Sequence, residues 1–296
     1  MVDYYGGKEK QLEAAIPILI ILLLIVGVAV LRPEVFQGIP VIGDFFGGET
    51  TKVLVIGDQA TERNGWADIL KSDMSRKVFG NPLNVDVVLP AGGDIDQSDI
   101  TGPYWIEAQK YDLVVVTGTQ LSDSLQLTLK EWVMEGGSLL VVGEGGIQPN
   151  GRWAELTNVL PVRCGLTEDC TTYSKTVYAP ELSVDEDAYS QKINQCIDTI
   201  TPLTENNESI VINDAQAIEE GNSLVIVEGF NSADEVQAGS TGILHSGILE
   251  RSFGVSGGKV VYMSFNPTTQ NINPDVEKSL VINMVAYAVG ESCYKP

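Results

Sequence analysis

The alternation of apolar and polar positions is most regular between Tyr111 and Gly146. Apolar, β-branched runs at 112–117 and 138–142 predict two buried strands. Between them, Ser122 is a candidate N-cap, apolar residues recur at helical spacing, and a glycine pair follows, so the segment predicts an amphipathic helix. Two buried strands joined by a helix form a right-handed βαβ unit with parallel strands. The rest of the domain must therefore cover this sheet.

Similar patterns flank this unit. They predict further strands at 52–57, 84–89, 223–228 and 259–264, a helix around Trp66 to Lys77, and a helix from Asn273-Pro274 to Gly290. Strands that alternate with helical or loop crossovers are typical of α/β proteins. We therefore expect an open, mostly parallel doubly wound sheet of the flavodoxin-like kind over 52–290, with an irregular insertion at about 148–221 and a tail at 291–296. Neither GxGxxG nor GxxxxGK[ST] occurs, so dinucleotide and P-loop chemistry have no support.

The N-terminal region has a different composition. After a segment at 1–13, residues 14–31 carry no charge and consist of aliphatic residues apart from Pro17 and Gly27. Such a run is long enough for an uncleaved transmembrane helix, whereas a signal peptide would have a shorter apolar core and a small-x-small site. Lys8 and Lys10 precede the span, which favours a cytoplasmic N-terminus and an extracytoplasmic C-terminal domain.

The residues just before the span also resemble a known class of protein. The segment Lys8-Glu9-Lys10-Gln11-Leu12-Glu13, followed by a long apolar helix, is similar to the start of archaeal pilin-like subunits. That resemblance implies an N-terminal helix that packs into a filament core.

A connector at 32–51 joins the span to the domain. It contains prolines and glycines, but also Phe36, Phe45 and Phe46. A flexible linker would be polar, so we expect these aromatic residues to contact a partner, the membrane interface or the domain itself.

The chain is strongly acidic. It has 40 acidic and 18 basic side chains, which gives a formal net charge of −22. Such a surface repels phosphate backbones, so nucleic acid is not an expected partner. The expected partners are membrane lipid and other envelope or membrane subunits, including further copies of this chain.

The soluble part resembles the class I glutamine amidotransferase-like superfamily, in particular its membrane-anchored members that lack glutaminase activity. The resemblance lies in the order of strands and helices, in the segments YDLVVVTGTQLSDSLQLTLKEWVMEGGSLLVVGEGG and LTNVLPVRCG, and in GGKVVYMSFNPTT before the last helix. It implies a glutamine amidotransferase-like fold from Lys52 to about Gly290.

The catalytic residues of that superfamily are not carried over. Where the enzymes have a nucleophilic cysteine on a sharp turn, this chain has Gly143-Glu144-Gly145. Where they have His-Pro-Glu after a late strand, it has Asn266-Pro267-Thr268. Acyl transfer of this kind needs a thiolate and an imidazole base. We therefore predict no catalytic residues, no cofactor and no glutaminase activity.

Four positions are candidates for chemistry. Glu144 follows a strand on a glycine turn, a common position for ligand contacts. A hydrolase or small-ligand sensor would combine it with Asp58 or Asn266, whereas in the simpler interpretation Glu144 is only solvated. His245, the only histidine, lacks a matching Cys or Asp cluster and is expected to be structural.

No metal site is predicted. The segment Asp94-Ile-Asp96-Gln-Ser-Asp99 resembles a calcium loop but lacks the glycine and the distal glutamate of an EF-hand. The cysteines lack the paired C-x₂₋₄-C spacing of a zinc site.

The four cysteines indicate disulfides in a domain outside the membrane. Three pairings are possible, and the preferred one joins Cys164 to Cys170 and Cys196 to Cys293. Asn207 begins an Asn-Glu-Ser sequon and is a glycosylation candidate. Taken together, the sequence predicts a non-catalytic, single-pass membrane protein of a cell-envelope assembly.

Overall fold

A computed structural model describes residues 50–57, 60–88, 111–118, 120–148, 150–164, 169–185, 192–197, 200–205, 208–254 and 257–293. The chain divides into two units, Met1–Thr50 and Thr51–Pro296, and all described residues except Thr50 lie in the second. Several predictions concern residues outside these ranges: the span at 14–31, the connector aromatics Phe36, Phe45 and Phe46, Asp58, the 94–99 loop and Asn207. Among the described residues, no helix has the length and apolar character needed to cross a membrane.

The core of the domain is a mixed sheet that confirms the α/β prediction. Five strands run parallel in the order β2-β1-β3-β4-β12, which is the flavodoxin-like order. Their bounds are β1 Lys52–Gly57, β2 Asn84–Val88, β3 Leu113–Thr117, β4 Ser138–Val142 and β12 Lys259–Met263. The three central strands are almost fully buried, as their continuous β-branched composition predicts.

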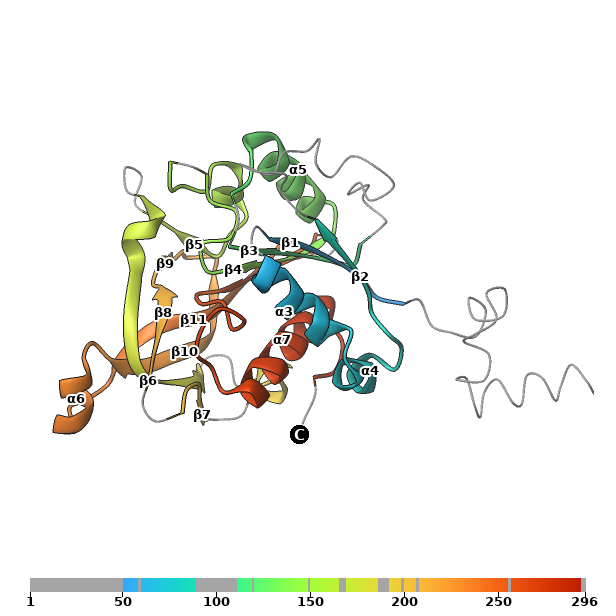
Figure 1. Cartoon of the computed structure of the whole chain (residues 1–296). Helices are drawn as coiled ribbons and strands as arrows, with labels where there is room; N and C mark the ends of the chain where they lie inside the picture. Colours follow the sequence, from blue (N-terminus) through green and yellow to red (C-terminus); the bar gives the residue numbers. More distant parts are fainter. Residues whose placement is uncertain are drawn as a thin grey trace, which may run out of the picture. The chain divides into compact units, whose positions relative to one another are not determined.

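Helices cover both faces of the parallel part (Figure 1). Helix α5 (Asp123–Met134) lies on one face, and α3 (Ala60–Leu70), α4 (Asp73–Phe79) and α7 (Pro274–Val289) lie on the other. The predicted cap of α5 is confirmed, since the Ser122 side chain accepts a hydrogen bond from the Leu125 amide. Helix α7 also begins as predicted, with Asn273 as its N-cap and Pro274 in its first turn.

The helix predicted around Trp66 to Lys77 is two helices. Helix α3 ends at Leu70, and Ser72 has an extended backbone and caps α4 by accepting from the Ser75 amide. The prediction was wrong at this point because Ser72 was not recognised as a cap that starts a new helix.

The sheet continues beyond β12 through antiparallel strands. The order β12-β11-β10-β6-β7 has antiparallel pairs throughout, and β8 also pairs with β6. The bounds are β6 Ser174–Val184, β7 Ile200–Pro202, β8 Ser209–Asn213, β10 Asn222–Phe230 and β11 Ile243–Ser252. The short helix α6 (Ala233–Ala238) connects β10 to β11 at the end of this extension (Figure 1).

The region at 148–221 is therefore more regular than its sequence indicated. It supplies β6, β7 and β8 to the main sheet and a separate two-stranded sheet of β5 (Val162–Arg163) and β9 (Gln216–Ala217). Its described residues also form the single-turn 3₁₀ helices η3 (Glu155–Asn158), η4 (Cys170–Tyr173) and η6 (Lys192–Gln195).

Both disulfides of the preferred pairing are present. Cys164 and Cys170 are joined with their Cα atoms 5.3 Å apart, and Cys196 and Cys293 with theirs 4.9 Å apart. Because all four cysteines are paired, the chain holds no free thiol.

Candidate functional site

The turn after β4 is built almost entirely from glycine. Gly143 and Gly146 have φ values of 58° and 80°, which favour glycine. A Cβ on Gly145 would lie 2.4 Å from the carbonyl oxygen of Val116 on β3, so this position requires close backbone approach. Glu144 is therefore the single member of this turn that carries a functional side chain, and it lies at the carboxyl end of a central parallel strand.

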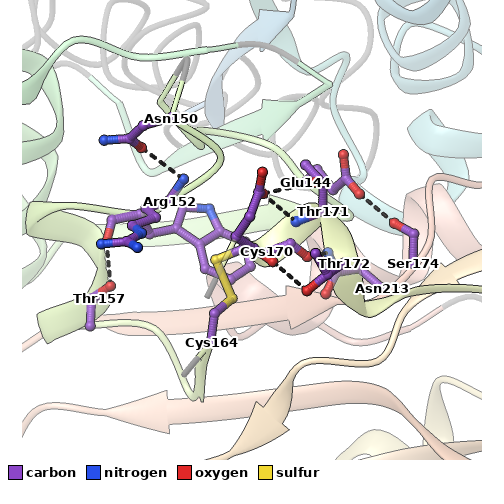
Figure 2. The surroundings of a disulfide bond; sticks show 12 residues. Glu144, Asn150, Arg152, Thr157, Cys164, Cys170, Thr171, Thr172, Ser174 and Asn213 are labelled. Carbon is purple, nitrogen blue, oxygen red and sulfur yellow. Dashed lines mark hydrogen bonds between the residues drawn. A yellow bond between two sulfur atoms is a disulfide. The ribbon is translucent and has the colours of Figure 1, made fainter. Parts of the chain in front are cut away.

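The Glu144 carboxylate has a defined partner. It accepts a hydrogen bond from the hydroxyl of Ser174, the first residue of β6 (Figure 2). Ser174 directly follows η4, whose first residue Cys170 belongs to the short disulfide loop, and the Asp169 carboxylate caps η4 by accepting from the Thr171 amide. Hydrogen bonds from the amide and the hydroxyl of Thr171 lower the pKa of Asp169 and keep its carboxylate charged. The disulfide loop thus leads directly into the residue that holds Glu144.

A second polar cluster lies around Asp214, which follows β8. Its Oδ2 atom is 2.6 Å from Lys175 Nζ and 3.1 Å from His245 Nδ1. The His245 side chain is only 4% exposed, whereas that of Lys175 is half exposed. Asp214 therefore links a surface cation on β6 to a buried imidazole on β11.

Tyr262 of β12 connects the two clusters. Its ring is buried and meets Trp153 edge-on with the ring centroids 5.8 Å apart, and its hydroxyl donates to the carbonyl of Asn213. Burial raises the pKa of Tyr262, and the negative charges of Glu144 and Asp214 raise it further. Both carboxylates thus act on the same buried hydroxyl, which places them in one electrostatic neighbourhood.

Asn266 has a different environment from the one expected for a partner of Glu144. Its Oδ1 atom accepts from the Trp66 indole N–H at 3.2 Å and from both the amide and the hydroxyl of Thr268. Trp66 belongs to α3, so Asn266 helps fix that helix to the loop after β12. Asp58, the other predicted partner of Glu144, lies outside the described residues.

The cysteine and histidine side chains of the domain are already paired. All four cysteines form disulfides, and the imidazole of His245, on the antiparallel strand β11, is paired with the carboxylate of Asp214. Within the described ranges, His, Cys, Asp and Glu side chains form no group of three or more that could hold a metal ion.

Most members of the two clusters were not identified from the sequence. Glu144 and His245 were singled out, but Ser174, Lys175 and Asp214 were not. The contacts span 30 to 39 residues, and they depend on the pairing of β6 with β8. No local motif marks such contacts.

No model of a known protein family matches the chain, and no curated protein matches it in sequence. A solved structure of a ThuA-like protein from Parabacteroides merdae is similar with a TM-score of 0.51 at 12% identity, over 84% of this chain and 93% of that one. An exo-β-1,4-mannosidase from Opitutaceae bacterium strain TAV5 matches with a TM-score of 0.41 at 10% identity, over 83% of this chain and 37% of that one. ThuA has a glutamine amidotransferase-like fold. The domain is therefore similar in fold to that class, and the likeness extends to the fold alone.

Proposed function

We propose that the protein is a non-catalytic, membrane-anchored scaffold or accessory subunit of a cell-envelope assembly, with its α/β domain outside the cytoplasm. The observation that carries this proposal is the pair of disulfides, which use all four cysteines. Disulfides persist in oxidising compartments and are rare in the cytosol. The uncharged run at 14–31 supplies the anchor, and the two lysines before it favour a cytoplasmic N-terminus.

The domain keeps the framework of a glutamine amidotransferase-like enzyme without its reactive groups. The turn that would present a nucleophile presents Glu144, held by the hydroxyl of Ser174. A rigid sheet with loops at its carboxyl edge is well suited to contacts with other proteins, because function in such folds resides in the loops. We therefore expect purified protein to release no ammonia from glutamine.

The partners would be reached through the N-terminal part. An aliphatic span without intramembrane charge suits anchoring in lipid and packing against other helices. The connector adds Phe36, Phe45 and Phe46, a set of aromatic residues typical of interaction surfaces. The net charge of −22 argues against nucleic acid as a partner.

Extraction in a gentle detergent, followed by sizing and electron microscopy, tests this function. We expect a complex larger than the monomer, which Phe45→Ser combined with Phe46→Ser dissociates. Leu244→Ser is the matched control, since Leu244 is 62% exposed on β11 and its loss should leave the complex intact. A monodisperse monomer, unchanged by the connector variant, would contradict the proposal.

Two other functions have specific support. The pilin-like N-terminal segment favours a filament subunit, and helical fibres in the micrographs would establish that alternative. The position of Glu144 at the carboxyl end of β4 favours a hydrolase or small-ligand sensor. Ammonia release from glutamine that Glu144→Gln abolishes would establish an enzyme instead.

A further inference from the structure

Basic residues gather in one short segment of this acidic chain. Residues 71–80, called the basic segment below, carry Lys71, Arg76 and Lys77 against the single acid Asp73, a net charge of +2, whereas the whole chain carries −22. No stretch of ten residues elsewhere in the sequence contains three basic residues. All three cations are exposed, and Asp73 is paired with Arg76 at 3.5 Å. The basic segment is therefore a positive surface on a strongly negative protein.

The packing of α4 explains why these cations face solvent. Met74, Val78 and Phe79 of α4 are partly buried against the hydrophobic core on the α7 side of the sheet. Arg76 and Lys77 lie in the last turn of the same helix and are exposed. The apolar side chains thus fix α4 to the domain, and the basic ones remain available to a partner.

The basic segment lies close to the point where the chain enters the domain. Only residues 80–83 separate α4 from β2, and four residues span at most about 14 Å. The first residue of β2, Asn84, pairs with Lys52 of β1, and its amide donates to the Thr51 carbonyl at 3.0 Å. Figure 1 shows α4 on the same side of the domain as the beginning of β1. The N-terminal part of the chain therefore joins the domain near α4.

The charges at this entry point leave the basic segment dominant. Lys52 and Asp112 are both exposed there, and the Asp112 carboxylate accepts a hydrogen bond from the Lys52 amide at 2.7 Å. The charges of these two side chains cancel. The +2 charge of the basic segment therefore sets the local sign.

The covalent connection makes a small number of cations sufficient. The connector at 32–51 can span at most about 70 Å even when fully extended. An anchor at 14–31 would therefore hold the domain at a high effective concentration near the bilayer. Attraction that would be too weak to recruit a free protein can then determine which side of the domain faces the lipid.

We propose that the basic segment binds an anionic lipid surface and turns the beginnings of the parallel strands toward the membrane. The partner is a bilayer whose phospholipid headgroups carry a net negative charge, because each Lys or Arg near such a surface strengthens the attraction about fivefold. The same surface repels the acidic remainder of the domain, which favours a single orientation. This inference rests on the membrane anchor of the proposed function.

Lysine reactivity in vesicles tests the orientation with the full chain. The protein is reconstituted into vesicles of phosphatidylcholine, with or without added phosphatidylglycerol, and its insertion is checked by flotation. An uncharged, membrane-impermeant acylating reagent then modifies the lysines, and mass spectrometry gives the rate at each one. We expect Lys71 and Lys77 to react more slowly in the anionic vesicles, relative to Lys130 and Lys175. High salt should remove this difference by screening.

Two matched variants separate the basic segment from charge in general. Arg76→Gln keeps both reporter lysines and should reduce their protection about fivefold, the effect of one lost cation. Arg163→Gln makes the same change at an exposed position on β5 and should leave the protection unchanged. Unaltered rates at Lys130 and Lys175 would show that each variant is folded.

The outcomes distinguish this inference from the function on which it rests. A chain that does not float with either kind of vesicle would contradict the anchor and overturn both. A chain that floats would overturn the orientation alone if Lys71 and Lys77 reacted equally in neutral and anionic vesicles. Equal slowing of all lysines, or equal effects of Arg76→Gln and Arg163→Gln, would overturn it as well.

Discussion

The two disulfides should contribute very differently to stability. Cys196–Cys293 connects residues 97 apart in sequence, whereas Cys164–Cys170 connects residues only 6 apart. A cross-link lowers the entropy of the unfolded chain in proportion to the logarithm of the loop that it closes. Removal of the long-range disulfide by Cys196→Ser with Cys293→Ser should therefore be the more damaging change.

The loop-closure relation gives the magnitudes. It predicts a loss of about 4.7 kcal/mol for the 97-residue loop and about 2.2 kcal/mol for the 6-residue loop at 25 °C. For a domain of this size, these losses correspond to a fall in Tm of roughly 9–19 °C and roughly 4–9 °C, respectively. The long-range disulfide also fixes the segment after α7 beside Cys196, whose carbonyl accepts from Asn283 of that helix at 2.7 Å.

Guanidinium unfolding of the domain, with circular dichroism as the readout, measures both effects. The matched variant is Cys164→Ser with Cys170→Ser, which makes the same chemical change at the short loop. A reducing agent should bring the wild-type protein close to the quadruple serine variant. The reasoning would be refuted if the short-loop variant lost as much free energy of unfolding as the long-loop variant, or more.

Three further predictions concern the stability of the domain. Gly145→Ala should destabilise the domain by about 2–3 kcal/mol because the new Cβ would meet a backbone carbonyl. Gly143→Ala should cost only about 1–2 kcal/mol, because this position has open space and only its positive φ opposes a side chain. Equal losses of free energy in urea unfolding would contradict this reasoning. Asn266→Ala should cost about 1–3 kcal/mol because it leaves a buried indole N–H without an acceptor, and an unchanged urea midpoint would argue against that hydrogen bond. Burial raises the pKa values of Tyr262 and Tyr287 in the folded protein, so the unfolded chain loses these protons first as the pH rises. Stability should therefore fall above about pH 10, by up to about 1.4 kcal/mol per pH unit for each tyrosine. Replacement of both tyrosines by Phe should flatten this slope, and a slope equal to that of the wild type would refute the assignment.

The regular part of the fold was predictable because local and long-range signals agree there. The run at 113–117 is β-branched and buried, Ser122 caps the following helix, and Leu125 and Leu129 face the sheet from it. Each of these features is visible in a short window of sequence. The right-handed connection of βαβ units then limits the arrangements that such strands can take.

The antiparallel extension was not predictable in the same way. Strand β6 has Pro180 in its interior, and Ala179 beside it has a φ of 46°, so the segment lacks a clean alternation of apolar and polar residues. Its pairing with β10 and β8 depends on contacts between distant parts of the chain. The start of β6 also places Ser174 beside Glu144 and Lys175 beside Asp214. Both polar clusters were missed because these contacts join distant parts of the chain.

The candidate site was therefore only partly identified. Glu144 was found because a carboxylate between glycines after a buried strand is recognisable by itself. His245 was noted as the only histidine, but its contact with Asp214 required the fold. The disulfide pairing was selected from three alternatives, and both of its bonds are present.

The central claim is that this disulfide-bonded domain lies outside the cytoplasm on a membrane anchor. Protease added to intact cells tests it most directly, with a cytoplasmic protein as the control for cell integrity. The account predicts that the domain is degraded or released while the control stays intact. Protection of the domain until the cells are lysed would contradict the account.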